Sequence, residues 1–224
     1  MTITQLSMLP HPPTRRRLLR NDIYDTIVEC ILDGSLAPGH RLRDAELTQW
    51  LTVSRTPIRE ALARLMVVGL IHTEPNRYTI VAPLDVVEVR EAIAVLRLLL
   101  PPAIRSAEGS SDLELRERML AILSRLEKDP TYDSPSAFEQ LLTLVIRDLG
   151  NSVLEEAADT AYLRFVRYLR LELPLKPVMN RERVRALASS LCYERSDAAH
   201  EIDTIFQDAL AALSDVKPGQ SAVP

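Results

Sequence analysis

At 224 residues, with 46% apolar and 26% charged side chains, the chain has the composition of a well-cored globular protein, which excludes overall intrinsic disorder. Aromatic residues make up only 4% and glycine contributes six residues, while leucine and alanine dominate, so the composition favours helices over an all-β fold. The net charge of −4 hides an asymmetry: residues 1–84 carry 10 arginines against 8 acidic residues, and the remainder carries 17 basic against 23 acidic ones. A mildly basic N-terminal part therefore precedes an acidic C-terminal part.

The sequence gives no reason to expect a membrane span or a disulfide. The longest apolar stretch, residues 92–104, is interrupted by Arg97 and by Pro101-Pro102 and is shorter than the about 20 residues that a span needs. Residues 1–20 lack the apolar core and cleavage site of a secretory signal. Cys30 and Cys192 lie far apart within apolar helical patterns, which is typical of reduced core cysteines. We expect a cytoplasmic protein.

The N-terminal part predicts three short helices. Residues 1–14, with three prolines and no apolar stripe, read as a flexible arm. Apolar residues then recur at four-residue steps from Leu19 to Ile31, and Gly34 ends this first helix. A second helix is expected at about 44–51. A third has Thr56 as its expected N-cap and Pro57 at its first helical position.

Two β-branched runs, residues 70–73 and 78–81, flank the turn-forming residues 74–77 and predict a hairpin. Three helices followed by a hairpin form a winged helix-turn-helix, expected at residues 15–83. Residues 84–85 read as a linker, and residues 215–224 as a disordered tail. Between them, apolar stripes with helical spacing predict an all-helical bundle over residues 86–214. The expected helices lie at about 86–107, 112–127, 134–148, 152–171, 181–194 and 197–214. The expected fold class is mainly α.

The start of the third helix has the features of a DNA-reading element. A recognition helix enters the major groove end-on, so its first-turn side chains reach the bases. Arg55 and Arg59 lie at that end, and an arginine can pair with two acceptors of guanine. Ser54, Thr56 and the helix amides suit phosphate oxygens. An isolated arginine is more often a solvated surface charge. Here the helical spacing, the wing and the net positive charge of residues 1–84 occur together, and this combination favours DNA binding.

Residues 18–83 resemble the DNA-binding domain of GntR-family bacterial transcription regulators. The resemblance is carried by ILDGSLAPGHRL, by AELTQWLTVSRTPIREALARLMVVGLI and by YTIVAP at the end of the wing. It implies operator contacts at Ser54, Arg55, Thr56 and Arg59, and at the wing tip Asn76 and Arg77. Family members often place an arginine nine residues before this serine, where the chain has Ala45, with Arg43 two positions earlier as the nearest candidate.

Residues 86–214 resemble the FadR-type C-terminal domain of the FCD subfamily, on the opening VVEVREAIAVLR, the LGNSVL turn and the order of helices. This resemblance implies a helical domain that binds a small molecule and forms most of a homodimer interface. A symmetric homodimer would read an inverted repeat in double-stranded operator DNA, because two recognition helices related by a two-fold axis face two half-sites.

Many FCD domains hold a divalent metal through one aspartate and three histidines. The corresponding positions here read Phe138, Leu142, Ala186 and Asp208, and the only histidine after residue 85 is His200, which we expect to be a surface or capping residue. We therefore expect no metal and no cofactor, and an organic effector that is apolar or anchored directly by arginine or tyrosine. The candidates, each of which is also compatible with a surface charge or a core-edge aromatic, are Arg90, Arg97, Tyr162, Arg164, Arg167 and Tyr168.

The sequence thus favours a ligand-responsive, DNA-binding transcription regulator. The alternative is a helical interaction protein, or an enzyme, that retains a vestigial winged helix. No GxGxxG, P-loop, GxSxG, HExxH or CxxC motif is present, so we expect no catalysis. Whether binding represses or activates stays open.

Overall fold

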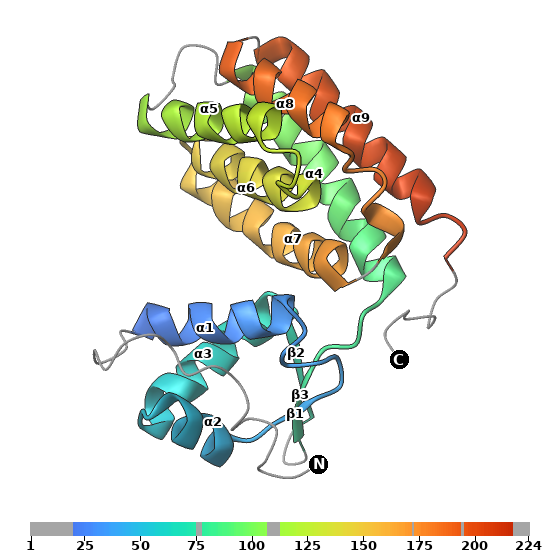
Figure 1. The fold of residues 1–224 in the computed structure, drawn as a ribbon. Coiled ribbons are helices and arrows are strands. Elements are labelled where there is room, and N and C mark those ends of the chain that lie inside the picture. The colour runs from blue at the N-terminus through green and yellow to red at the C-terminus, as the bar shows by residue number, and fades with distance from the viewer. Residues whose placement is uncertain (1–19, 75–77, 107–112, 172, 194, 217–224) are drawn as a thin grey trace. The chain divides into compact units, whose positions relative to one another are not determined.

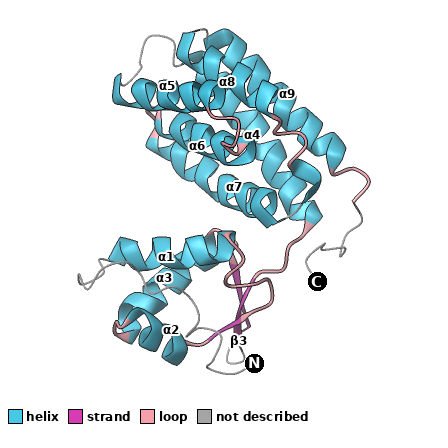
Figure 2. Ribbon diagram, viewed as in Figure 1, coloured by secondary structure: helices cyan, strands magenta, loops and turns pink. Residues whose placement is uncertain are grey.

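The computed structural model describes residues 20–74, 78–106, 113–171, 173–193 and 195–216. The chain divides into two compact units, Met1–Leu84 and Asp85–Pro224. Figure 2 shows strands only in the first unit, whereas the described part of the second unit is built from helices. The expected fold class, a winged helix-turn-helix followed by an all-helical unit, is confirmed. The expected arm at residues 1–14 and most of the expected tail lie outside the described residues.

Three helices form the core of the first unit: α1 (Arg20–Leu32), α2 (Asp44–Leu51) and α3 (Arg55–Val67). Helices α1 and α2 both pack against α3. Ile27, Leu47 and Ile58 contribute one fully buried side chain from each helix. Between α2 and α3 the chain turns at Thr52, whose φ of 56° lies in the left-handed region, so the helix-turn-helix bend rests on a β-branched residue in a costly conformation.

The wing is a three-stranded antiparallel sheet in the order β1-β3-β2. Its strands are β1 (Arg41–Leu42), β2 (Ile71–Glu74) and β3 (Tyr78–Val81). The hairpin β2–β3 was expected and pairs Ile71 with Val81, whereas β1, which pairs Arg41 with Ile80, was not. A two-residue strand is too short to show the alternation by which strands are recognised in a sequence.

The start of α3 differs from the expectation. The helix begins at Arg55 and its N-cap residue is Ser54, not Thr56, so Pro57 is the third helical residue rather than the first. Proline is accommodated there because the N–H groups of the first helical turn have no acceptor within the helix. The earlier start adds Arg55 to the first turn and leaves the Ser54 side chain without a capping hydrogen bond.

The second unit contains six described α-helices: α4 (Val86–Ser106), α5 (Leu113–Lys128), α6 (Ser134–Arg147), α7 (Ser152–Leu171), α8 (Arg181–Tyr193) and α9 (Arg195–Ala212). Helix α4 packs against α7 and α9, and α8 packs against α5 and α9 (Figure 1). Pro101 and Pro102 lie inside α4 without ending it. A short 3₁₀ turn, η2 (Leu173–Leu175), follows α7.

Three phenylalanines meet in the core of this unit. Phe138 from α6, Phe165 from α7 and Phe206 from α9 are fully buried and contact one another edge to face, with ring centroids 5.9 to 6.4 Å apart. Edge-to-face packing brings the positive edge of one ring to the negative face of another. The cluster therefore stabilises the packing of the three helices by more than the burial of its apolar surface alone.

The two cysteines differ in their surroundings. Cys192 is buried as expected, but Cys30 is only half-buried, because its position on α1 lies at the edge of the core-facing stripe. Partial burial and the neighbouring carboxylates of Asp33 and Glu29 still raise the pKa of the Cys30 thiol to about 11, so this thiol is protonated near neutral pH. Within the described residues, no helix combines the length and apolarity that a bilayer crossing requires.

Candidate functional site

The N-terminal end of α3 presents a polar, solvent-facing surface. Ser54, Arg55 and Thr56 are all exposed, while Ile58, Ala61, Leu62 and Leu65 on the opposite face anchor the helix in the core. The first-turn amides of a helix are unpaired donors and carry the positive end of the helix dipole. A helix fixed by its apolar face and free at its N-terminus has the geometry for binding phosphate and reading an adjacent base.

Two of the expected DNA-contacting arginines are held by acidic residues of α2. The Arg59 Nε donates to the Asp44 Oδ2 across 2.9 Å, and the Arg43 Nη1 donates to the Glu46 Oε1 across 2.9 Å. The Arg59 side chain remains 71% exposed, so solvent screens this pair and its rupture costs little. Arg55 forms no such ion pair with the described residues, so it is more available to a ligand than Arg59.

Arg64, further along α3, has a structural contact instead. Its guanidinium lies 3.8 Å from the centroid of the Tyr24 ring on α1, which ties α3 to α1 through a cation–π interaction. The expected wing-tip residues Asn76 and Arg77 lie outside the described residues.

Several arginines expected to bind an effector are distributed over the helical unit. Arg90 is exposed on α4. Arg97, also on α4, donates from Nε to the Asp203 Oδ1 of α9 across 2.7 Å, and this hydrogen bond lowers the pKa of the Asp203 carboxyl. Arg164 makes a long hydrogen bond of 3.4 Å from Nη1 to the Thr160 carbonyl of its own helix. Arg97 therefore fastens α4 to α9.

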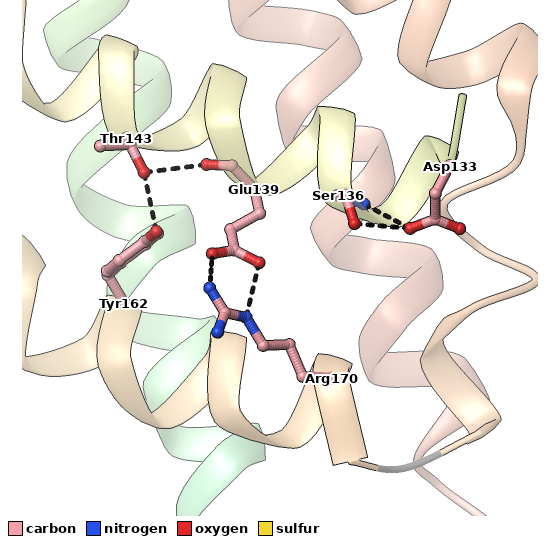
Figure 3. A network of polar contacts seen from close by, with 6 residues as sticks. All are labelled: Asp133, Ser136, Glu139, Thr143, Tyr162 and Arg170. Atoms are coloured by element: carbon pink, nitrogen blue, oxygen red, sulfur yellow. Dashed lines mark hydrogen bonds and ion pairs between the residues drawn. The ribbon is translucent and has the colours of Figure 1, made fainter. Parts of the chain in front are cut away.

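Tyr162 belongs to a polar network between α6 and α7 (Figure 3). Its hydroxyl lies 2.7 Å from the Thr143 Oγ1, which also donates to the Glu139 carbonyl. The Glu139 carboxylate in turn accepts two hydrogen bonds from Arg170, one of them across 2.9 Å from Nε. The Glu139 side chain is only 16% exposed, so it is not part of a solvated helix face. The network fixes the register of α6 on α7.

Two further candidates are buried. Tyr168 is 3% exposed, and Arg167 is the one charged side chain of the described residues that is buried. Burial lowers the pKa of Arg167 to about 10, and the Glu88 carboxylate of α4 opposes this shift. Arg167 therefore remains a cation at neutral pH inside the helical unit.

The four positions that the resemblance to FCD domains would align with metal ligands are apolar or ion-paired. Phe138 and Leu142 are buried in the core, Ala186 is half-buried, and the Asp208 carboxylate pairs with Arg183. His200 is exposed on α9. The described residues contain no group of three or more histidine, cysteine or carboxylate side chains that could hold a metal ion.

A cavity of about 370 Å³ lies between α5 and α6, and none of the effector candidates from the sequence lines it. Its polar residues are Arg118, Arg125, Tyr132, Gln140 and Thr143. The sequence did not single them out, because they come from two helices and a turn whose proximity depends on packing. The spacing of 118, 121, 122 and 125 on one face of α5 is the one signal that could have indicated a shared surface.

Comparisons with known proteins agree with this architecture. A family model described as "Bacterial regulatory proteins, gntR family" matches residues 19–81. The chain is 28% identical over 221 residues to the uncharacterized HTH-type transcriptional regulator Rv0494 of Mycobacterium tuberculosis, covering 95% of this chain and 82% of that protein. It is 32% identical over 158 residues to the uncharacterized HTH-type transcriptional regulator YdfH of Escherichia coli O6:H1, covering 65% of this chain but only 64% of that protein.

Among solved structures, that titled "E. coli McbR/YncC" has the same fold, with a TM-score of 0.69, 19% identity, and coverage of 87% of this chain and 96% of that one. The two sequence relatives are named as transcriptional regulators and not as enzymes, which agrees with the expectation that the chain is not an enzyme. The model of the gntR family of bacterial regulatory proteins thus covers residues 19–81, and over longer ranges the chain is similar to proteins named as HTH-type transcriptional regulators.

Proposed function

We propose that the protein is a sequence-specific DNA-binding transcriptional regulator that acts as a homodimer in the cytoplasm and responds to a small organic molecule. The observation that carries the DNA-binding part is the exposed N-terminus of α3, with Ser54, Arg55 and Thr56 facing solvent in a winged helix-turn-helix that matches the GntR family. Arg55 reads a base, while Ser54, Thr56 and the first-turn amides hold phosphates. Arg43, Arg59, Asn76 and Arg77 add contacts to the backbone or to bases.

A binding measurement on the DNA upstream of the protein's own gene tests this function, because regulators commonly occupy that region. Fluorescence anisotropy is compared for this duplex and a shuffled duplex of the same composition. The protein is expected to prefer the upstream duplex, and Arg55→Ala is expected to lose about 1–3 kcal/mol of binding free energy and to relax preference at one base pair. Arg185→Ala, which removes an exposed arginine from α8, is the matched control. Equal affinity of Arg55→Ala and the parent for both duplexes would refute the assignment.

The outer face of α4 supports the homodimer. Opposite the side that packs on α7 and α9, this helix exposes Val87, Val95 and Leu98 at 41%, 41% and 74%. Ala94 and Pro102 on the same face are exposed as well. An apolar stripe along an exposed helix face is unfavourable in a monomer and typical of a protein–protein interface.

The charges beside this stripe favour a second copy of the same helix as its partner. Glu91 and Arg105 are both exposed and lie seven residues before and after Leu98, which is two helical turns in each direction. If two copies of α4 cross antiparallel on a two-fold axis at Leu98, each Glu91 faces the partner's Arg105. Such a self-complementary surface is what a symmetric dimer requires.

The effector part of the proposal extends the resemblance of residues 86–214 to FCD domains. Six helices of the expected order support it. The dimer can be in two states that differ in the spacing of its two DNA-binding domains. A ligand that binds one of these states more tightly than the other would change operator affinity by the difference between its two binding free energies.

A further inference from the structure

The cavity between α5 and α6 has the size of a small-molecule site. Its volume of about 370 Å³ falls within the range of roughly 300–1,000 Å³ that is usual for ligand pockets. Arg118, Ala121, Ile122 and Arg125 of α5 form one wall, and Gln140, Thr143 and Leu144 of α6 form the other. Tyr132, in the connection between the helices, also lines the cavity.

The residues that line the cavity favour a ligand of a particular charge and shape. Ile122 and Leu144 are largely buried and give the cavity an apolar floor. The Arg125 guanidinium lies over the Tyr132 ring, 4.0 Å from its centroid, and this cation–π interaction holds the cation at the cavity. The N–H groups lie in the plane of the guanidinium, so the stacked ring does not use them. No carboxylate lines the cavity, and its two charged residues are both cations, of which Arg118 is already paired with Glu114 of the same helix across 2.7 Å.

A hydrogen bond inside the cavity also favours an acceptor ligand. The Tyr132 hydroxyl donates to the Gln140 Oε1 across 3.1 Å. The Gln140 carboxamide oxygen is therefore engaged within the protein, and its amide nitrogen adds two N–H donors to the cavity lining. Together with Arg125, these donors are complementary to the two oxygens of a carboxylate.

The cavity is held in place by an arginine that does not line it. Arg181, at the start of α8, donates to the backbone carbonyls of Leu126, Asp129, Pro130 and Tyr132 at 2.6 to 3.0 Å. Four hydrogen bonds from one guanidinium fix the α5–α6 connection and with it the position of the Tyr132 ring. A site that is ordered before the ligand arrives loses less free energy on binding.

We propose that this cavity binds a small organic carboxylate with a compact apolar body, with Arg125 and Gln140 holding the carboxylate and the Ile122–Leu144 floor holding the body. The regulatory consequence rests on the proposed function, because this ligand would be the effector of the DNA-binding protein. The site differs from the core of the unit, where Phe138, Phe165 and Phe206 fill the space between α6, α7 and α9.

The test uses the full-length protein and two probes of the same shape, 4-phenylbutyrate and its uncharged amide, 4-phenylbutyramide. Isothermal titration calorimetry is expected to detect the acid and to give at least about tenfold weaker binding for the amide, since a hydrogen bond to a charged group contributes roughly 1.5–3 kcal/mol. Arg125→Gln should lower the affinity for the acid by about the same factor. Arg185→Gln, on the exposed face of α8, should not change it.

A second variant keeps the test independent of charge. Ala121→Trp fills the cavity from the exposed side of α5 and should abolish binding of the acid, while circular dichroism verifies that the helices remain. Equal binding of acid and amide, no binding of either, or unchanged affinity in Arg125→Gln would each overturn the proposal. Operator binding measured on the same samples separates the two hypotheses: a protein that binds DNA but not the acid retains the proposed DNA-binding function and loses only this site.

Discussion

The Arg59 guanidinium on α3 donates to the Asp44 carboxylate on α2 across 2.9 Å, so a residue expected to contact DNA is held by an acidic residue of the preceding helix. DNA binding through Arg59 must exchange Asp44 for a phosphate or a base. Asp44→Asn removes this competition and a negative charge near the DNA. An exposed ion pair contributes about 0.2–1 kcal/mol, so operator affinity is expected to rise by up to about fivefold.

The same anisotropy measurement over a series of salt concentrations checks this prediction. If Arg59 gains a phosphate, the slope of log K against log salt becomes steeper by about 0.9. Asp33→Asn is the matched control, because it removes the same charge from the end of α1 and keeps an oxygen that can accept from the Ser35 N–H. An equal gain in both variants would mean that net charge alone, and not the release of Arg59, sets the affinity.

The turn between α2 and α3 predicts a stabilising substitution. Thr52 has a φ of 56° and an exposed side chain. The left-handed conformation costs a residue with a Cβ about 1–2 kcal/mol, whereas glycine adopts it freely but loses about 0.5–1 kcal/mol more backbone entropy on folding. Thr52→Gly should therefore raise the free energy of unfolding by up to about 1.5 kcal/mol. Urea denaturation measures this change, and a lower midpoint for Thr52→Gly would contradict the strain assigned to this residue.

The described helices could be predicted from the sequence because each carries an apolar stripe with clear end signals. The expected helix at 44–51 coincides with α2, and the expected helix at 152–171 coincides with α7. The start of α3 could not be predicted in the same way. Both Ser54 and Thr56 are good capping residues, and Pro57 is acceptable anywhere in a first turn, so local preference did not distinguish the two starts.

The candidate binding residues could be predicted from the sequence only where they are consecutive in the chain. Ser54, Arg55 and Thr56 are consecutive, so their place on one helix end followed from the pattern. The pairing of Arg59 with Asp44 and the cavity around Arg125 and Tyr132 depend instead on contacts between helices. One sequence without an alignment carries no signal for such contacts.

Chelation is expected to leave the protein unchanged. The positions that the resemblance to FCD domains would align with metal ligands include two buried apolar side chains, Phe138 and Leu142, and the Asp208 carboxylate is already neutralised by Arg183. A single paired carboxylate among apolar groups does not offer the several converging donors that zinc, nickel or manganese needs. Elemental analysis after dialysis should give no stoichiometric metal, and EDTA should not shift the thermal midpoint. One retained metal per chain would overturn this expectation.

The outer face of α4 predicts where the homodimer can be broken. Leu98→Asp places a charge at the centre of the proposed two-fold contact, where it would be buried against the same charge of the second copy, so the dimer should dissociate. Sedimentation velocity at micromolar concentration should then give a species of 25.2 kDa instead of twice that mass. Leu113→Asp is the matched control, because Leu113 on α5 is also 74% exposed and lies outside the α4 face.

Charge reversal tests the antiparallel register of this contact. Glu91→Arg should weaken the dimer because two arginines then face each other at each end, and Arg105→Glu should weaken it in the same way with two glutamates. The double variant restores opposite charges across the two-fold axis and should recover the dimer, since like charges in a contact oppose association and their joint reversal removes the conflict. Only a contact in which Glu91 faces the partner's Arg105 gives this rescue. If the double variant is as dissociated as the single ones, or if Leu98→Asp stays dimeric, the second copy binds through a different face of the helical unit.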